Sequence, residues 1–405
     1  MRNIPLPIRI AAVFAAATFA LFITTTAASA QIETVLYNFT STGSAGTLPN
    51  LSVAFDNAGN LYGTTGEAVF KLIPNAAGSW TPRTLHIFRG IPDGSISSGG
   101  VILDATGNVY GLTNGGGRGG VGTVYELVRS ANGQYTEKIL HHFGQNTDGK
   151  YPFGALTVDA AGNLYGTTQS GGTNNTGTVF ELIPTALGPW TEKVLYNFNL
   201  SGDGANPMVG VIFDGAGNLY GTTGTGGVSD GGTAYKLSPQ SDGSWTETTL
   251  LSFSHGSEPD GSLTLDKSGN LYGATIYGGA HNVGVVYKLS PQTDGSWTET
   301  ILHSFNINEK DGFNAFTGLV FDAAGNLYGA TMSGGIYGGS NGFGTVFELT
   351  PQADGTWTES MVFSFNGTNG EGPSWGGLTF DASGNLYGAS RTGGIGDGTV
   401  FKLTP

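Results

Sequence analysis

A five-residue motif, Gly-Asn-(Leu/Val)-Tyr-Gly, constrains the fold of this chain more than any other feature. It occurs seven times, with its first glycine at positions 59, 107, 162, 217, 269, 325 and 384, so the copies lie on average about 54 residues apart. A period of this length is typical of stacked or radial arrays built from one supersecondary unit. The chain must therefore be interpreted as seven copies of one structural element.

Each unit is predicted to contain four short β-strands. In the third unit we expect strands at residues 155–158, 163–168, 178–183 and 190–198, which are rich in Val, Leu, Ile, Tyr, Phe and Thr. An Asp-x-x-Gly-Asn turn joins the first two strands, and a Pro…Asp-Gly…Trp turn joins the last two. No segment after residue 30 has a long helical period of apolar residues, so the sequence predicts an all-β fold.

The two ends of the chain indicate how the units are arranged. Residues 33–39 resemble a fourth strand that precedes the first unit, whereas the last unit stops after its third strand, at residues 398–403. Every unit has four strands only if these segments pair, and an open solenoid would need capping repeats instead. We therefore predict a seven-bladed β-propeller of four-stranded antiparallel blades, closed by the N-terminal strand.

The first 30 residues differ from the rest of the chain. Arg2 and Arg9 precede an apolar run at residues 10–23, and Ala28-Ser29-Ala30 supplies a small-residue cleavage site. The run is shorter than the roughly 20 residues that a membrane-spanning helix needs. We expect residues 1–30 to be a signal peptide cleaved near Ala30, and residues 31–405 to be a single propeller domain, secreted or periplasmic and without a membrane span.

Composition excludes several functional classes. The chain has no cysteine, which removes disulfides, thiolate metal ligands and a cysteine nucleophile. Loss of the signal peptide takes away two arginines and no acidic residue, so the net charge falls from −14 to −16, which argues against nucleic acid as a partner. Only 11% of the residues are charged, and a surface of Ser, Thr, Asn and Gly suits neutral ligands.

The repeat resembles a known family. Asp-Ala-Ala-Gly-Asn-Leu-Tyr-Gly-Thr-Thr at residues 159–168, followed by Gly-Gly and by Gly-Thr-Val-Phe-Glu-Leu at residues 177–182, is similar to the GloVer tandem repeat of exported bacterial proteins. The resemblance covers nearly the whole chain after residue 30 and implies export rather than a particular reaction. Members often carry a C-terminal anchor, whereas this sequence ends at Pro405 directly after a strand. The motif is also similar to NHL-type propellers, so the fold alone points to several functions.

Loop lengths predict which end of the propeller carries function. The Asp-x-x-Gly-Asn turn has one length in all seven units, whereas the connection from the second to the third strand varies. We measure this connection from the motif tyrosine to the valine position of the third strand. The distance is 7 residues in the first unit (Tyr62–Val69), 14 in the next four, 18 in the sixth (Tyr328–Val346) and 13 in the last. Variable loops on a constant scaffold are where binding usually occurs.

The same end receives the loops between blades, which carry an acidic residue before glycine. These residues are Asp93, Asp148, Asp203, Asp260, Asp311 and Glu371. One interpretation is a ring of carboxylates around one mouth of the channel, which would bind a cation or sugar hydroxyls. The other, which we favour, is that these carboxylates cap backbone amides in turns. The seven aspartates of the hairpin turn are predicted to hold that turn, because a lone carboxylate supplies too few oxygens for calcium.

Other candidate binding residues lie in the variable loops. Two interpretations are open for the aromatic residues Trp375, Tyr337 and Tyr277: they stack on sugar rings, or they cover blade edges. His281, Arg118 and Arg391 are the side chains to be tested as acid, base or oxyanion partners. His86, His141 and His303 fill a slot that holds other bulky residues elsewhere, so they are predicted to be structural, and we expect no cofactor or metal.

The sequence leaves three functional classes open. The first is an exported binding propeller that recognises a glycan or another cell-surface polymer. The second is a carbohydrate-active lyase or hydrolase on the same face, although no known catalytic motif is present and no catalytic residue is predicted. The third is a structural envelope protein without a small ligand. Oligomeric state is not determined by the sequence.

Overall fold

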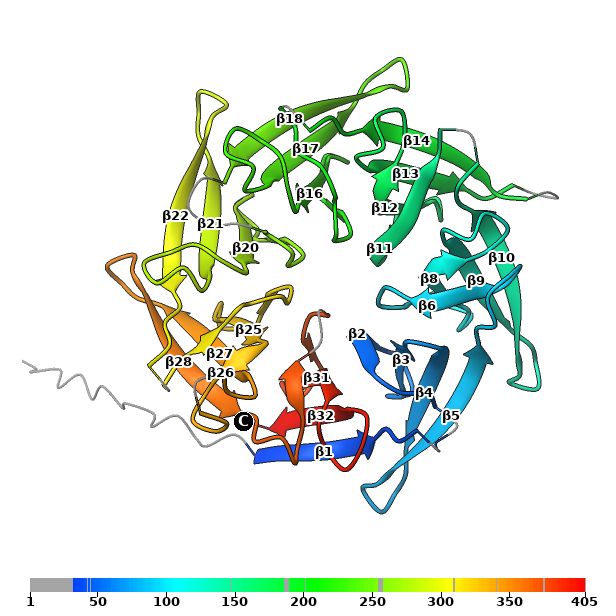
Figure 1. Cartoon of the computed structure of the whole chain (residues 1–405), viewed down its shortest axis with the longest axis vertical. Coiled ribbons are helices and arrows are strands. Elements are labelled where there is room, and N and C mark those ends of the chain that lie inside the picture. The colour runs from blue at the N-terminus through cyan, green and yellow to red at the C-terminus, as the bar shows by residue number, and fades with distance from the viewer. Residues whose placement is uncertain are drawn as a thin grey trace, which may run out of the picture. The chain divides into compact units, whose positions relative to one another are not determined.

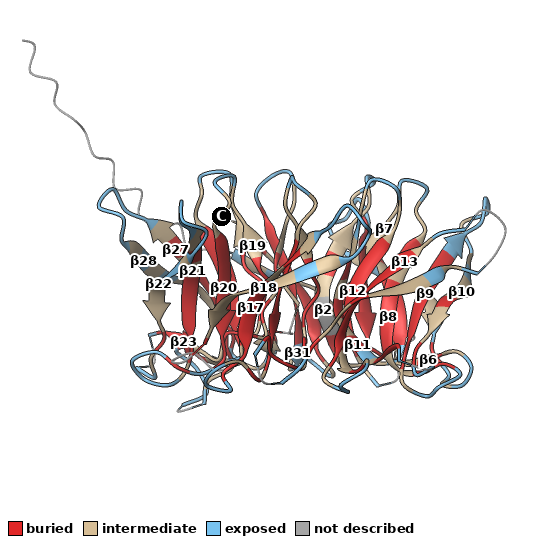
Figure 2. Cartoon of the chain, turned by 90° about the horizontal axis from the view of Figure 1, so that it is seen from above, coloured by how far each residue is buried: buried red, intermediate tan, exposed pale blue. Residues whose placement is uncertain are grey.

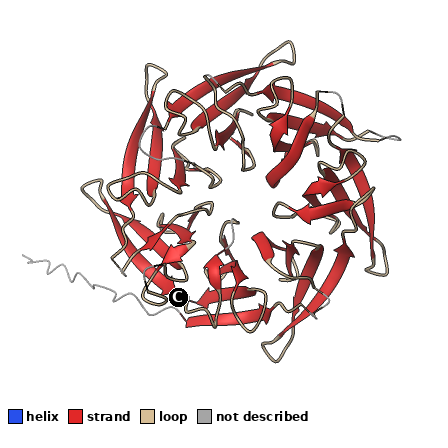
Figure 3. Ribbon diagram, in the orientation of Figure 1, coloured by secondary structure: helices blue, strands red, loops and turns tan. Residues whose placement is uncertain are grey.

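Antiparallel strands form seven blades around a central axis in the computed structural model (Figure 1 and Figure 3). The structure describes residues 32–41, 43, 45–145, 147–185, 189–200, 202–253, 258–308, 310–339, 341–373 and 376–404. The expected signal peptide lies outside these residues. No helix occurs in the described ranges, and accordingly none of them offers a helix fit to cross a membrane. The fold is the predicted seven-bladed β-propeller.

Blade 3 shows the pattern of a single unit. Its strands are β11 (Gly149–Val158), β12 (Leu164–Gly171), β13 (Thr178–Ile183) and β14 (Thr191–Asn197), paired in that order from the axis outward. The four predicted strands are confirmed, and β11 begins earlier than expected. Its pairing with β12 shifts register between Phe153 and Thr157, which marks a β-bulge or irregularity in the strand.

The other blades repeat this order. In blades 2, 6 and 7 the first strand is divided into two pieces. Blade 1 contains β2 (Pro49–Phe55), β3 (Leu61–Thr65), β4 (Ala68–Pro74) and β5 (Trp80–Ile87); blade 2 contains β6 (Gly94–Ser97), β7 (Ile102–Leu103), β8 (Val109–Gly116), β9 (Thr123–Arg129) and β10 (Tyr135–His142). Blade 4 contains β15 (Ile212–Phe213), β16 (Leu219–Thr223), β17 (Thr233–Pro239) and β18 (Trp245–Ser252); blade 5 contains β19 (Thr264–Leu265), β20 (Leu271–Thr275), β21 (Val285–Pro291) and β22 (Trp297–Ser304). Blade 6 contains β23 (Gly312–Phe313), β24 (Val320–Phe321), β25 (Leu327–Thr331), β26 (Ser333–Gly334), β27 (Thr345–Pro351) and β28 (Trp357–Ser364); blade 7 contains β29 (Glu371–Pro373), β30 (Thr379–Phe380), β31 (Leu386–Thr392), β32 (Thr399–Thr404) and β1 (Ile32–Asn38).

Ring closure follows the prediction. β1 pairs with β32 from Ile32 opposite Thr404 to Asn38 opposite Thr399, so the N-terminal strand completes blade 7. A side-chain hydrogen bond from Thr379 Oγ1 to the carbonyl oxygen of Val53, 3.0 Å long, joins blade 7 to blade 1. Both ends of the described chain therefore belong to one blade, and the array is a closed ring.

The hydrophobic core consists of layers between neighbouring blades. A fully buried phenylalanine directly after an outer strand packs edge-on against an aromatic ring of the next blade's third strand, as in Phe143 with Phe180, whose ring centroids are 5.1 Å apart. Phe39 and Phe70 make the same contact across the closure, also at 5.1 Å. Such pairs contribute about 0.5–1.5 kcal/mol beyond the area that they bury.

The two ends of the ring carry different connections. Figure 2 shows the hairpin turns along one edge of the side view and the long loops along the other. We call the first edge the turn face, formed by the first-to-second and third-to-fourth strand turns. The second is the loop face, formed by the second-to-third strand loops and the connections between blades. All candidate binding residues of the sequence analysis belong to connections or strand ends at the loop face, except where noted below.

Candidate functional site: the loop face and the blade junctions

On the turn face the aspartate carboxylates accept hydrogen bonds from groups of their own hairpin. In blade 1 the Asp56 carboxylate accepts hydrogen bonds from the backbone amides of Ala58 and Asn60, both at 3.0 Å. The Asn60 side chain and the Tyr62 hydroxyl also donate to it, at 2.7 and 3.0 Å. Burial opposes ionisation, but these donors and the nearby Lys71 lower the pKa of Asp56 to about 2. The carboxylate holds the turn, as predicted.

On the loop face the backbone follows a repeated path while the side chains differ. Near the start of each first strand, eight residues before the turn aspartate and nine in blade 7, one residue has a left-handed backbone with φ of 56–60°. The seven residues at this position are Leu48, Ile96, Tyr151, Asn206, Glu258, Asn314 and Gly372. In five blades the amide of this residue donates to a carbonyl in the preceding blade's loop, for example Tyr151 to Val121 at 2.8 Å. The interblade bond fixes the backbone and leaves the side chain variable.

A second variable position lies in the second-to-third strand loop. Its amide donates to the side chain of the last residue of the outer strand, as Val228 donates to Ser252 Oγ at 2.7 Å. The residues at this position are Arg118, Thr173, Val228, Ala280, Ile336 and Ile395. The amide of Arg118 donates to His142 Nδ1 at 3.3 Å. The imidazole of His142 takes the place of the Ser or Asn side chain that accepts this hydrogen bond in the other blades.

Four of the six predicted loop carboxylates lie at blade junctions, beside the outer strand. Asp93, Asp148, Asp203 and Asp311 each accept backbone amide hydrogen bonds within their own loop. Each also contacts the bulky outer-strand residue of the preceding blade, which is His86, His141, Tyr196 or His303. The His Nε2 to carboxylate distances are 3.0–3.2 Å. The turn-capping interpretation is therefore confirmed for these residues.

Asp260 and Glu371 do not belong to this series. Each of the four junction aspartates lies eleven residues before the aspartate of the hairpin turn that follows it. Asp260 lies only six residues before Asp266, at the position that Met208 occupies in blade 4. Asp260 lines the central cavity, and Glu371 lies in an exposed groove of the loop face. The single ring of six carboxylates is therefore incorrect. An Asp-Gly or Glu-Gly pair occurs at more than one position of the interblade loop, so the pair alone does not identify the position.

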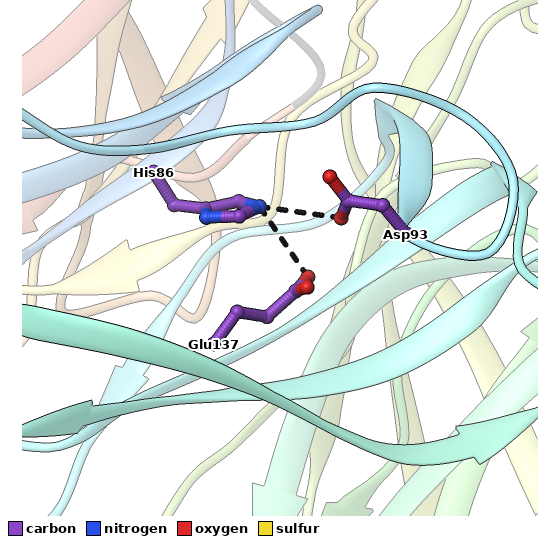
Figure 4. A group of neighbouring side chains, drawn as sticks. All are labelled: His86, Asp93 and Glu137. Atoms are coloured by element: carbon purple, nitrogen blue, oxygen red, sulfur yellow. Dashed lines mark hydrogen bonds and ion pairs between the residues drawn. The ribbon is translucent and has the colours of Figure 1, made fainter.

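The junction carboxylates have partners that the sequence analysis missed. A glutamate on the outer strand of the next blade, two residues after the strand-starting Trp or Tyr, faces the same junction. Figure 4 shows Glu137 and Asp93 converging on His86, with Glu137 Oε1 3.5 Å from His86 Nε2. The Trp-Thr-Glu repeat was a visible signal for these residues, at Glu192, Glu247, Glu299 and Glu359.

Burial perturbs the ionisation of these glutamates. Burial, followed by the hydrogen bond and charge of Asp93, raises the pKa of Glu137 to about 8. Burial raises the pKa of Glu247 and of Glu359 to about 7, with further contributions from the charges of Asp203 and Asp311. These three junctions therefore each hold two neighbouring carboxyl groups, of which the glutamate is the harder to ionise.

The central cavity is small. It has a volume of about 30 Å³ and is lined by first-strand residues of all seven blades, among them Ser52, Met208 and Phe316. Neighbouring first strands approach closely beside it, since a Cβ on Gly99 would lie 2.0 Å from the carbonyl oxygen of Gly154 in the next blade. Such a volume holds about one water molecule.

Asp260 is the titratable side chain in the lining of this cavity. Burial and the negative charge of Glu258 raise the pKa of Asp260 to about 7. Its Oδ1 atom is buried and accepts no hydrogen bond from the described part of the chain. The axis therefore carries a carboxyl group that is half protonated near neutral pH.

A larger hollow lies on the loop face between blades 6, 7 and 1. This groove, about 480 Å³ in volume, is lined by Glu371 and Arg391 together with Leu48, Met332 and Asn341, among others. It brings two of the predicted binding residues together. The size is within the 300–1,000 Å³ typical of small-molecule sites.

Two other candidates, Arg118 and Asp148, line a second hollow of about 540 Å³ between blades 2 and 3. His281 and Arg118 are exposed in the loops of blades 5 and 2, and Arg391 lines the groove between blades 6, 7 and 1, so the proposed acid–base set does not converge. Tyr277 and Tyr337 are 42% and 46% exposed on the loop face. Trp375 lies outside the described residues.

The repeat family is identified by comparison with known proteins. Residues 20–212, 66–258 and 211–405 each match the Gloeobacter/Verrucomicrobia repeat. The chain belongs to this family. No curated protein sequence matches it.

Solved structures similar to this Gloeobacter/Verrucomicrobia repeat protein are distant in sequence. Virginiamycin B lyase from Staphylococcus aureus is 16% identical, with 93% of this chain and 99% of that chain covered and a TM-score of 0.57. An ancestral GH74 enzyme is 15% identical, with 88% of this chain and 48% of that chain covered and a TM-score of 0.58. The extracellular domain of a hybrid two component system from B. thetaiotaomicron is 13% identical over 91% of this chain and 39% of that one, with a TM-score of 0.56. At such identities the similarity shows the propeller fold alone.

Proposed function

We propose that this repeat protein is an exported binding propeller whose loop face recognises a polyhydroxylated polymer, a glycan of the cell surface or its surroundings. One observation carries the proposal: the loop face repeats two backbone positions, one in all seven blades and one in six, while the side chains at these positions change. A constant scaffold with variable side chains is the usual arrangement of a recognition surface. On the turn face, by contrast, the Asp and Gly-Asn residues that hold the Asp-x-x-Gly-Asn turn are the same in every blade.

The groove beside Glu371 and Arg391 supplies the chemistry that a sugar requires. The Glu371 carboxylate accepts hydrogen bonds from hydroxyl groups, whereas the Arg391 guanidinium and the Asn341 amide donate them. Met332 and Leu48 add apolar surface for the C–H face of a sugar ring. The low charged fraction of the chain, 11%, and its negative net charge favour a neutral glycan over a polyanion.

A glycan screen tests this function. The chain from residue 31 onward would be applied to a glycan array, and hits would be measured by isothermal titration calorimetry. We expect Glu371→Gln and Arg391→Gln to weaken binding at least tenfold. Arg129→Gln is the matched control, because Arg129 lines a hollow of about 400 Å³ on the turn face.

Three outcomes have different meanings. Binding that is lost in both groove variants and kept in the control supports the proposal. Absence of binding to every glycan tested, or equal loss in the control, contradicts it. Release of shorter saccharides during incubation would assign the face to a carbohydrate-active enzyme instead.

Export is tested separately. Expression of the full chain with its own N-terminus, followed by N-terminal sequencing of the product, is expected to give Gln31 as the first residue. A product that keeps residues 1–30 would contradict the signal peptide.

A further inference from the structure

Two blade junctions place one histidine and two carboxylates around a common point. His303, Asp311 and Glu359 each offer one ligand atom, and these atoms lie within 4.8 Å of one another. The same is true of His86, Asp93 and Glu137 (Figure 4). In each cluster the three residues come from an outer strand, the loop that follows it and the outer strand of the next blade.

The cluster between blades 5 and 6 contains polar atoms that the protein itself does not satisfy. The Asp311 side chain is only 4% exposed, yet its Oδ1 atom has no hydrogen-bond partner in the described part of the chain. Glu359 Oε1 is likewise buried without a partner there. A buried carboxylate oxygen left unpaired costs free energy, and native structures retain few of them. An ion between these oxygens and His303 would remove that cost.

Distances in the cluster between blades 1 and 2 fit a tetrahedral metal. His86 Nε2 lies 3.2 Å from Asp93 Oδ1 and 3.5 Å from Glu137 Oε1. Ligand bonds of about 2.0–2.1 Å at tetrahedral angles place neighbouring ligand atoms about 3.3 Å apart. In the other cluster His303 Nε2 lies 3.0 Å from Asp311 Oδ2. Small side-chain adjustments would complete either site.

We propose that the clusters His303–Asp311–Glu359 and His86–Asp93–Glu137 are binding sites for a divalent transition-metal ion of the Zn²⁺ class. One imidazole nitrogen and two carboxylate oxygens are ligands that Zn²⁺ accepts, and a water molecule completes its four-coordinate shell. Calcium does not fit, because it requires six to eight oxygen ligands. The ion ties one blade to the next, so metal binding stabilises the closed ring.

A neighbouring junction of the same protein is a natural metal-free control. Between blades 3 and 4, Tyr196 takes the place of the histidine and donates its hydroxyl to Asp203, with Glu247 nearby. Tyr196 pairs opposite Val179 just as His303 pairs opposite Val286. A His→Tyr substitution therefore removes the nitrogen ligand and leaves a residue that the same framework already accommodates.

The test measures Zn²⁺ binding to the chain from residue 31 onward after treatment with EDTA and exchange into chelator-free buffer. Isothermal titration calorimetry is expected to give about two Zn²⁺ per chain, and Zn²⁺ should raise the Tm. Each of His86→Tyr and His303→Tyr should remove one equivalent, and the double variant both. Co²⁺ should give the visible absorption of a tetrahedral site in the wild type and not in the double variant.

Controls separate metal binding from folding. His281→Ala, in an exposed loop, should keep both equivalents. Each variant must keep the wild-type circular dichroism spectrum and Tm in EDTA, and Glu359→Gln and Glu137→Gln provide isosteric alternatives if a tyrosine variant does not fold. Failure of the wild type to bind Zn²⁺, or unchanged stoichiometry in folded double variants, overturns the proposal. Neither result bears on glycan binding at the Glu371 groove.

Discussion

The turn face and the loop face are built from the same seven repeats but use their side chains differently. On the turn face each Asp-x-x-Gly-Asn carboxylate is saturated by donors of its own hairpin, as Asp56 is by Ala58, Asn60 and Tyr62. On the loop face the repeated bonds involve backbone amides, and side chains such as Val228 project into solvent with 89% exposure. A repeat protein can therefore keep its architecture on one face and vary its chemistry on the other.

The comparison also explains where exposed apolar residues occur. Most of the large hydrophobic side chains that are exposed in the described chain lie in loop-face connections, including Ile91, Ile96, Leu200, Val228 and Ile395. Scattered apolar residues on a surface need no explanation, but their concentration on one face is consistent with the binding role proposed for it. The loop face thus combines hydrogen-bonding and apolar positions, which is the mixture that sugar recognition uses.

Opening the ring would have the largest effect, because both faces depend on closure. Deletion of residues 31–39 removes β1 and Phe39, whose burial is complete. Loss of a buried phenylalanine alone costs about 3–5 kcal/mol, and the exposed edge of β32 invites association with other chains. We expect a much lower Tm and aggregation in size-exclusion chromatography. A chain that begins at residue 31 is the control, and a monodisperse deletion variant with wild-type Tm would contradict closure by β1.

Asp260 is predicted to make stability depend on pH. Its pKa of about 7 in the folded chain exceeds its ordinary value of 3.8, so between these values the folded chain binds more protons than the unfolded chain. The contribution of Asp260 to the free energy of unfolding should fall as the pH rises from about 4 to 7, and the junction glutamates with raised pKa values add slope of the same sign. Asp260→Asn should make the slope shallower by the share of Asp260 and stabilise the protein at pH 8 by up to about 4 kcal/mol.

Urea denaturation at a series of pH values from 4 to 8 measures this slope. Asp242→Asn is the control, since Asp242 is exposed in a turn-face hairpin. If the free energies of unfolding of the wild type and of Asp260→Asn change with pH in parallel, the carboxyl group in the cavity has an ordinary pKa and the prediction is wrong.

A smaller effect is expected from a turn-face aspartate. Asp266 accepts hydrogen bonds from the amides of Ser268 and Asn270 and from the Asn270 and Tyr272 side chains, at 2.7–3.1 Å. Asp266→Ala leaves these donors unpaired and should cost about 2 kcal/mol. The matched loop-face change Val228→Thr should cost less than about 0.5 kcal/mol. Equal losses in urea unfolding would remove the distinction between the two faces.

The smallest predicted effect concerns the left-handed position of the loop face. Ile96 is held at φ 57° although it is β-branched, and it is 60% exposed. Asparagine tolerates this conformation and occupies the same position as Asn206 and Asn314. Ile96→Asn should therefore stabilise the protein by about 0.5–1 kcal/mol. Ile395→Asn, exposed on the same face without a positive φ, should be neutral, and a gain of equal size there would mean that removal of surface apolar area is the cause.

Sequence reasoning predicted repeated features well and single features poorly. The hairpin turns, the slot shared by His86, His141 and His303, and the pairing of β1 with β32 each followed from patterns that recur in several units. Asp260 and Glu371 were assigned to the wrong position because an acidic residue before glycine occurs at more than one place in a variable loop. Their true positions depend on backbone conformation, above all on the left-handed residue that begins each first strand.

The sequence by itself determined the number of blades, the strand order within each blade and the closure of the ring, since alternating apolar residues and glycine turns specify local hairpins. Only the tertiary structure decided which side chains meet between blades. Glu137 and His86 are 51 positions apart and belong to different repeats, so no local pattern relates them. Their contact exists because ring closure fixes the angle between neighbouring sheets, and with it the distance between side chains that face each other across a junction.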